Sequence, residues 1–173
     1  DISERLRSLF FRRGQACILT SATMSVGDEH MEWFRNRIGA MKTDALQIGS
    51  PFDYSKQMKL YLVQNIPAPN DPRYETELTN WIEHFLNVSQ GHAFVLFTSY
   101  RLMGALADQM DEYFSARDWD FLVQGRDGSR SAILDRFRKS DNAVLFGTES
   151  FWTGVDVPGE ALSNVIITRL PFA

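Results

Sequence analysis

The densest group of residues able to bind a ligand lies between positions 147 and 159, directly after the apolar run Ala143–Phe146. Its glycines let the main chain approach a ligand closely, and Asp156 can accept a hydrogen bond from a sugar hydroxyl. Phe151 and Trp152 can stack on unpaired nucleobases. The competing interpretation places both rings in the core and has Asp156 cap a turn. We expect at least one of the two rings in the core, with Trp152 the better base contact.

Two other loops carry polar side chains after apolar runs. Ser99 suits the N-cap of a following helix, while Thr98 and the first helical amides suit an anion such as a phosphate.

Gln124 ends a further run, and the glycines after it permit an open turn. Arg126 and Arg130 can bind phosphates through their planar donors. We favour an ordinary solvated loop for Arg126, with a cap from the neighbouring serine at position 129, and leave Gln124 and Arg130 open.

Near the start, hydroxyl residues follow the run 16–19. Ser21 and Thr23 can bond phosphate oxygens or a neighbouring acidic loop. They can equally turn the chain or cap a helix, and without further context the second interpretation is favoured.

Short apolar runs alternate with amphipathic stretches along the chain. The predicted strands are residues 16–20, 59–63, 93–97, 121–123, 143–146 and 165–168. The predicted helices follow apolar stripes in residues 2–10, 31–38, 78–86, 102–114 and 133–137. Apolar strands that alternate with helices predict an α/β fold with a mostly parallel sheet and helices on both faces. Such sheets bind ligands at the carboxyl ends of their strands.

Composition limits the function classes. The 173 residues suffice for one domain, and no apolar run approaches the ~20 residues of a membrane span, so no membrane partner is expected. A net charge of −4 argues against a broad basic surface but allows a narrow track for nucleic acid. The single cysteine, Cys17, excludes an internal disulfide and is expected to be a buried thiol, with a reducing, cytoplasmic setting. The three histidines are scattered, and no metal-ligand spacing is present.

Several blocks, in this order, resemble the motifs of the XPD/DinG group of superfamily 2 helicases. Residues 18–24 resemble motif III, residues 94–100 motif IV, and residues 144–159, with the sequence Phe-Trp-Thr-Gly-Val-Asp at their centre, motif V. Residues 49–54 and 169–172 resemble DinG-type members in particular. The resemblance covers nearly the whole chain.

The resemblance implies a RecA-like fold and a motor that pulls itself along single-stranded DNA, usually 5′ to 3′. Residues 25–173 would form the second motor domain, ending before motif VI, and residues 1–24 would carry motif III at the boundary with a first motor domain. The sequence opens without a methionine and stops directly after a strand-like run, so both of its ends are expected to be cuts. ATP would lie between the two domains.

Carried over residue by residue, Ser21, Ala22 and Thr23 would couple the nucleotide state to the grip on DNA. Gly154 and Asp156 would face the nucleotide. The residues assigned to DNA are Thr98, Ser99, Gln124, Arg130, Thr148, Phe151 and Trp152. No catalytic or metal-ligating residue is expected within the chain.

The expected partners are single-stranded DNA and the first RecA-like domain of the same protein, in the bacterial cytoplasm beside the nucleoid. ATP and Mg²⁺ would be bound mainly by that first domain, because this sequence has no phosphate loop and no Asp-Glu-Ala-His block. The chain alone is therefore expected to have no ATPase activity. An iron–sulfur cluster is possible in the whole protein but not in this chain.

Two other function classes stay open. The chain can belong to a binding module that has lost its motor chemistry and only holds nucleic acid or a partner protein. It can also be a free-standing α/β enzyme for small molecules, although that would require a self-contained catalytic group. A phosphate loop in the whole protein would favour the motor over the module.

Overall fold

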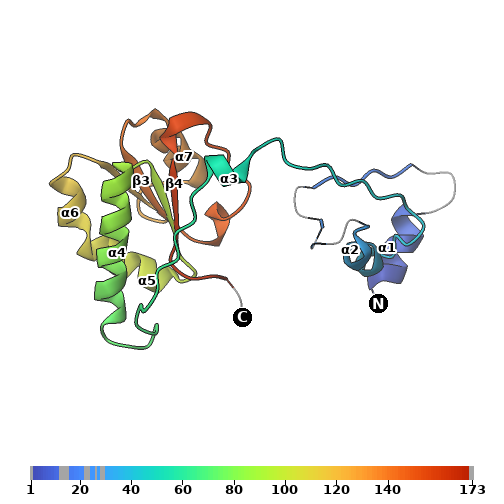
Figure 1. Cartoon of the computed structure of the whole chain (residues 1–173), viewed down its shortest axis with the longest axis horizontal. Coiled ribbons are helices and arrows are strands. Elements are labelled where there is room, and N and C mark those ends of the chain that lie inside the picture. The colour runs from blue at the N-terminus through green and yellow to red at the C-terminus, as the bar shows by residue number, and fades with distance from the viewer. Residues whose placement is uncertain (1, 12–15, 22–23, 26, 28–29, 172–173) are drawn as a thin grey trace. The chain divides into compact units, whose positions relative to one another are not determined.

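The computed structural model describes residues 2–11, 16–21, 24, 25, 27 and 30–171. The chain divides into two units, Asp1–Tyr61 and Leu62–Ala173. The first unit contains α1 (Ile2–Phe10), α2 (Glu32–Ile38) and α3 (Tyr54–Gln57). The second contains α4 (Tyr74–Ser89), β1 (Ala93–Leu96), α5 (Tyr100–Gln109), α6 (Asp111–Ser115), β2 (Asp120–Val123), α7 (Arg130–Lys139), β3 (Ala143–Gly147), the short 3₁₀ helices η1 (Glu149–Phe151) and η2 (Gly159–Ala161), and β4 (Asn164–Ile167) (Figure 1).

The second unit is built on a four-stranded sheet in which all neighbouring strands are parallel. The strand order is β2-β3-β1-β4. Leu96 is level with Gly147 and Ile167, and Val123 is level with Phe146. The carboxyl ends of all four strands therefore lie at one edge of the sheet. This arrangement confirms the predicted α/β, RecA-like fold.

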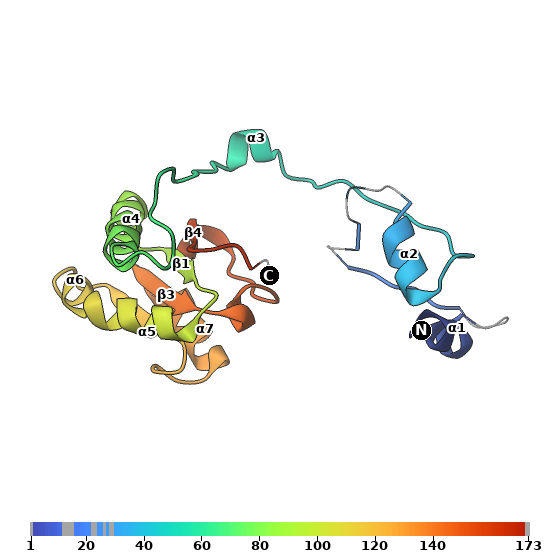
Figure 2. The same cartoon turned by 90° about the horizontal axis from the view of Figure 1, so that it is seen from below.

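Helices cover both faces of this sheet. In β1, Val95 packs into a core with α4, α5 and α6, whereas Phe94 and Leu96 pack into a second core with α7. Successive side chains of a strand point to opposite faces, so an entirely apolar strand fills two cores at once. Every residue of β1 and β3 is buried. Figure 2 shows these two strands with α4 to one side.

Serine caps start the two helices nearest to the carboxyl edge. Ser99 Oγ accepts a hydrogen bond from the Leu102 amide at 3.4 Å, and Ser129 Oγ accepts one from the Ala132 amide at 3.3 Å. Both caps were predicted and are confirmed. Such a cap stabilises a helix by about 1 kcal/mol, so it favours a defined first residue for α5 and for α7.

The first unit depends on polar contacts to the main chain. Arg7 Nε donates to the Gly39 carbonyl at 3.0 Å, and Arg35 Nη2 donates to the Met41 carbonyl at 2.7 Å. Gly39 has φ of 76°, and a Cβ there would clash with the main-chain oxygen of Ser3. Among its described residues, Ala40 is the one buried hydrophobic side chain. This unit therefore has almost no apolar core of its own.

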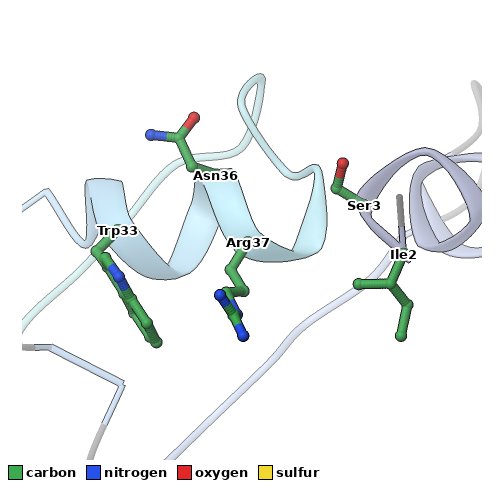
Figure 3. A pocket seen from close by; sticks show the side chains of 5 residues that line it. All are labelled: Ile2, Ser3, Trp33, Asn36 and Arg37. Atoms are coloured by element: carbon green, nitrogen blue, oxygen red, sulfur yellow. The ribbon is translucent and has the colours of Figure 1, made fainter.

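An open hollow is lined by residues of α1 and α2 (Figure 3). Its walls are Ile2, Ser3, Trp33, Asn36 and Arg37. The Arg37 guanidinium lies 5.6 Å from the centroid of the Trp33 ring, a cation–π contact. Trp33 and Ile2 remain 60% and 67% exposed, so the hollow is a surface feature with apolar walls.

Two predicted strands are wrong, because residues 16–20 and 59–63 form no strand. Ile18 is 86% exposed and Leu60 is 75% exposed. An apolar run becomes a strand only where a neighbouring strand pairs with its main chain, and the run alone does not supply that neighbour. The strands that the structure describes all belong to the second unit.

Cys17 is exposed, so the prediction of a buried thiol is wrong for the same reason. The predicted domain limits, 1–24 and 25–173, stay a prediction beside the observed division after Tyr61. Within the part of the chain that the structure describes, no helix is long and apolar enough to cross a membrane.

Replacing Gly147 tests the packing at the carboxyl edge. A Cβ there would lie 2.8 Å from the Phe151 ring, so Gly147→Ala should lower the free energy of unfolding by about 1–3 kcal/mol. Gly104, inside α5, is the matched control, because a Cβ there would meet nothing within 4 Å. Gly104→Ala should raise the free energy of unfolding by about 0.5–1 kcal/mol. Urea unfolding of the chain measures both, and equal effects would contradict this account.

Candidate functional site at the carboxyl edge of the sheet

The parallel sheet brings most of the predicted site residues to one edge. Thr98 and Ser99 follow β1, Gln124 follows β2, and the segment 148–156 follows β3. The strand-end rule therefore selected loops that are neighbours in space, as direct hydrogen bonds between them confirm.

The side-chain amide of Gln124 joins these loops. Its Oε1 accepts hydrogen bonds from the amide and the hydroxyl of Thr148, at 2.7 and 3.0 Å. Its Nε2 donates to Tyr100 Oη at 2.6 Å and to Ser150 Oγ at 2.9 Å. Because a main-chain N–H can only donate, the Thr148 amide determines which end of the Gln124 amide is the oxygen. One side chain thus connects the segments that follow β1, β2 and β3.

Arg130, the first residue of α7, supports the loop after β3 through main-chain carbonyls. Its Nε donates to the Ser150 carbonyl at 2.9 Å, and its Nη2 donates to the carbonyls of Thr153 at 3.2 Å and Gly154 at 2.8 Å. Carbonyls satisfy these donors without neutralising the charge. Among the ion pairs of the described residues, Arg130 has no carboxylate partner. A positive charge therefore remains beside the edge.

Arg138, near the end of the same helix, makes a related contact. Its Nη2 donates to the carbonyl of Asp156 at 2.6 Å, and its Nη1 lies 3.4 Å from Asp135. The side chain of Asp156 is exposed. Two arginines of α7 therefore hold the loop after β3 at two places, and the Asp156 carboxylate faces solvent.

The two adjacent aromatic residues have different environments. Phe151 is 3% exposed, and its ring meets Phe94 edge to face at 6.5 Å. Its assignment to DNA does not fit this burial, because a base cannot reach a ring enclosed in the core. Trp152 is half-buried, packs beside the same core, and donates from Nε1 to the Phe97 carbonyl at 3.3 Å. Trp152 is thus the member of the pair with an accessible ring.

The hydroxyl residues also differ in access. Thr98 is exposed at the entry to α5, and Ser99 uses its hydroxyl as the helix cap. Thr148 is 3% exposed, and both of its donors point to Gln124. Of these residues, Thr98 is therefore the one whose hydroxyl is open to a phosphate without rearrangement. Gly154 has φ of 66°, which favours glycine in this turn.

Comparison with known proteins identifies the family to which this edge belongs. The helicase C-terminal domain family matches residues 82–173, which include all four strands. The chain belongs to this family.

The chain is also similar to several helicases and a nuclease. It is 36% identical over 172 residues to the ATP-dependent DNA helicase YoaA of Escherichia coli K12, covering 99% of the chain and 26% of YoaA. It is 34% identical over 175 residues to the ATP-dependent helicase DinG of Mycobacterium tuberculosis H37Rv, covering 99% and 26%. It is 32% identical over 175 residues to the 3′-5′ exonuclease DinG of Bacillus subtilis, covering 98% and 19%. These findings confirm the predicted resemblance to DinG-type helicases. The chain spans about a quarter or less of the length of these relatives.

Sequence reasoning missed three residues of this helicase domain's edge. Tyr100, Ser150 and Arg138 all bond to predicted site residues or to their main chain. Tyr100 and Ser150 lie inside the motif-like blocks 94–100 and 144–159, so the strand-end rule would have found them had it been applied to every residue of these loops. Arg138 lies at the far end of α7, and nothing in its sequence position indicated this contact.

The motif III residues have a different status. Ser21 lies in the first unit, while Ala22 and Thr23 lie outside the described residues. Their coupling role stays a prediction.

Arg126 pairs with Asp111 at 3.5 Å and lies 5.1 Å from the Phe121 ring, which fits the favoured structural interpretation. In the described part of the helicase domain, no group of three or more histidine, cysteine or acidic residues is arranged to hold a metal ion.

Gln124→Leu tests the junction of the loops. It leaves the buried amide and hydroxyl of Thr148 without their acceptor, so the free energy of unfolding should fall by about 1–3 kcal/mol. Gln124→Glu is the matched control, because a carboxylate still accepts from Thr148 and from hydroxyls that can turn to donate. Urea unfolding of the chain should show a smaller loss for Gln124→Glu. Wild-type stability in Gln124→Leu would contradict the assigned bonds.

Proposed function

We propose that this chain is part of an ATP-dependent DNA helicase that moves along single-stranded DNA in the 5′ to 3′ direction. The chain would supply the grip on the strand and one wall of the ATP cleft. Membership of the helicase C-terminal domain family and the names of the YoaA and DinG relatives support the helicase assignment. The observation that carries the strand-gripping role is the junction at Gln124, which joins three loops at the carboxyl edge.

The edge offers donors suited to a phosphate backbone. Thr98 has an exposed hydroxyl directly before α5, and the first turn of a helix presents main-chain amides and the positive end of its dipole to an anion. Arg130 adds a positive charge that no carboxylate in the described residues neutralises. These contacts do not distinguish one base from another, as a motor that steps along any sequence requires. A net charge of −4 fits a local track better than a broad basic surface.

The aromatic and nucleotide-facing residues complete the proposal. Trp152, half-buried beside the edge, would contact a base. Gly154 and the exposed carboxylate of Asp156 suit one side of a nucleotide, with the main chain close and an acceptor for a sugar hydroxyl. Hydrolysis of ATP would supply the energy of movement, and the nucleotide would be held with Mg²⁺ mainly by a first RecA-like domain. An iron–sulfur cluster, if the whole protein has one, would lie outside this chain.

The first test is ATP hydrolysis by the intact protein that contains this chain, with and without single-stranded DNA. DNA should stimulate hydrolysis strongly, and Trp152→Ala should raise the DNA concentration needed for half-stimulation about tenfold, since a base–aromatic stack contributes about 1–3 kcal/mol. Asp156→Ala should instead raise the KM for ATP, because it removes the proposed acceptor for the sugar hydroxyl. Val88→Ala, at a 70% exposed site on α4, is the surface control.

The outcomes of this test separate the function classes. Stimulation that Trp152→Ala weakens, in a variant whose unfolding midpoint is retained, supports the motor and places the strand over this domain. Absence of hydrolysis in folded protein under every condition would contradict the motor and favour the binding module.

The chain alone should release no phosphate from ATP. Its sequence contains no phosphate loop to hold the β- and γ-phosphates with Mg²⁺. A phosphate-release assay on the purified chain, beside the intact protein at equal concentration, measures this. If the chain still hydrolyses ATP after a second purification, the proposal that a first domain holds ATP for catalysis is wrong.

A further inference from the structure

Tyr100 is unusual among the aromatic side chains of the second unit. It is 61% exposed, while each other phenylalanine, tyrosine or tryptophan in the described residues 62–171 is buried or half-buried. It packs into neither core of the sheet. Burying an aromatic ring is favourable, and the Tyr100 ring, exposed beside the carboxyl edge, still has apolar surface that a ligand can cover.

The exposed ring is also held in place by its polar end. Gln124 Nε2 donates to Tyr100 Oη at 2.6 Å, and the same amide is fixed from the other side by the buried Thr148. The tether acts at the tip of the side chain, so it limits rotation of the ring without covering its faces. Tyrosine has only two side-chain torsions, and an anchored ring therefore loses little freedom when a ligand stacks on it.

The position of Tyr100 gives the chemistry of the ligand. It is the first residue of α5, two residues after the exposed Thr98, and Trp152 bonds the main chain of Phe97 just before them. Tyr100 and Trp152 thus lie beside the segment at Thr98, which is suited to bind a phosphate. An unpaired nucleobase offers a flat π face, and its own backbone supplies the phosphate.

We propose that Tyr100 is a stacking platform for an unpaired nucleobase of the bound strand, positioned by Gln124. This site rests on the proposed strand-binding function and adds to it a specific residue. The platform reads no sequence, because every base has a π face. It explains why Gln124 bonds a residue that contributes nothing to either core.

The test compares two strands of equal length and charge in the intact protein, by fluorescence anisotropy. One is a labelled oligothymidylate of about 20 nucleotides, and the other has the same backbone with abasic sites. Tyr100→Ala should bind the oligothymidylate about tenfold more weakly than the wild type and should bind the abasic strand equally well. Tyr100→Phe keeps the ring and should lie close to the wild type. Tyr61→Ala, which removes a tyrosine that is 62% exposed in the first unit, is the matched control.

Each other result overturns a particular statement. If Tyr100→Ala binds both strands as the wild type does, the platform is absent, while strand binding by this protein is retained. If it weakens both strands equally, Tyr100 acts on the backbone or on the loop, and stacking is wrong. If the wild type binds neither strand and DNA does not stimulate its ATPase activity, the proposed function itself has failed. Unfolding midpoints of all variants show whether each change is local.

Discussion

The hydrogen bonds of the Gln124 amide are the interaction on which the whole carboxyl edge depends. Its oxygen satisfies both donors of Thr148, a residue that is 3% exposed, and its nitrogen reaches Tyr100 and Ser150. A buried donor without an acceptor would cost about 1–3 kcal/mol, so this amide is strongly held in one position. The loops after three strands are therefore fixed relative to one another. They form one surface for a ligand instead of three independent loops.

The sheet itself explains why this surface is at the edge. Strands β1 and β3 are buried along their whole length, so neither face of these two central strands can meet a ligand. A ligand is therefore expected to bind to the loops. One of them, the loop after β3, is contacted by α7. Arg130 and Arg138 hold the carbonyls of this loop, while α7 itself packs into the core. The loop after β3 is consequently coupled to α7, and a displacement of one has to be accommodated by the other.

The two units follow different physical rules. In the second, apolar runs find neighbouring strands and helices and become a sheet with two cores. In the first, similar runs remain exposed, with Ile18 at 86% and Leu60 at 75%, and polar contacts such as Arg7 to Gly39 connect the helices. Periodicity records that a segment is apolar, whereas strand formation also requires a partner main chain. That is why the same pattern correctly predicted a strand at residues 93–97, where β1 covers Ala93–Leu96, and wrongly predicted one at residues 16–20.

The sequence by itself indicated the apolar segments that become the strands of the second unit, the two serine caps, the loops that form the edge, and the helicase family, because these depend on local patterns and on motif order. The pairing of the strands came from the tertiary structure. Tertiary structure alone decided what each side chain does there. Thr148 and Phe151 read as ligand contacts in the sequence, yet their environments come from Gln124 and from Phe94, and both are buried. Tyr100 acquired its anchored, exposed ring in the same way. Burial and hydrogen-bond partners are set by segments distant along the chain, and no local pattern contains them.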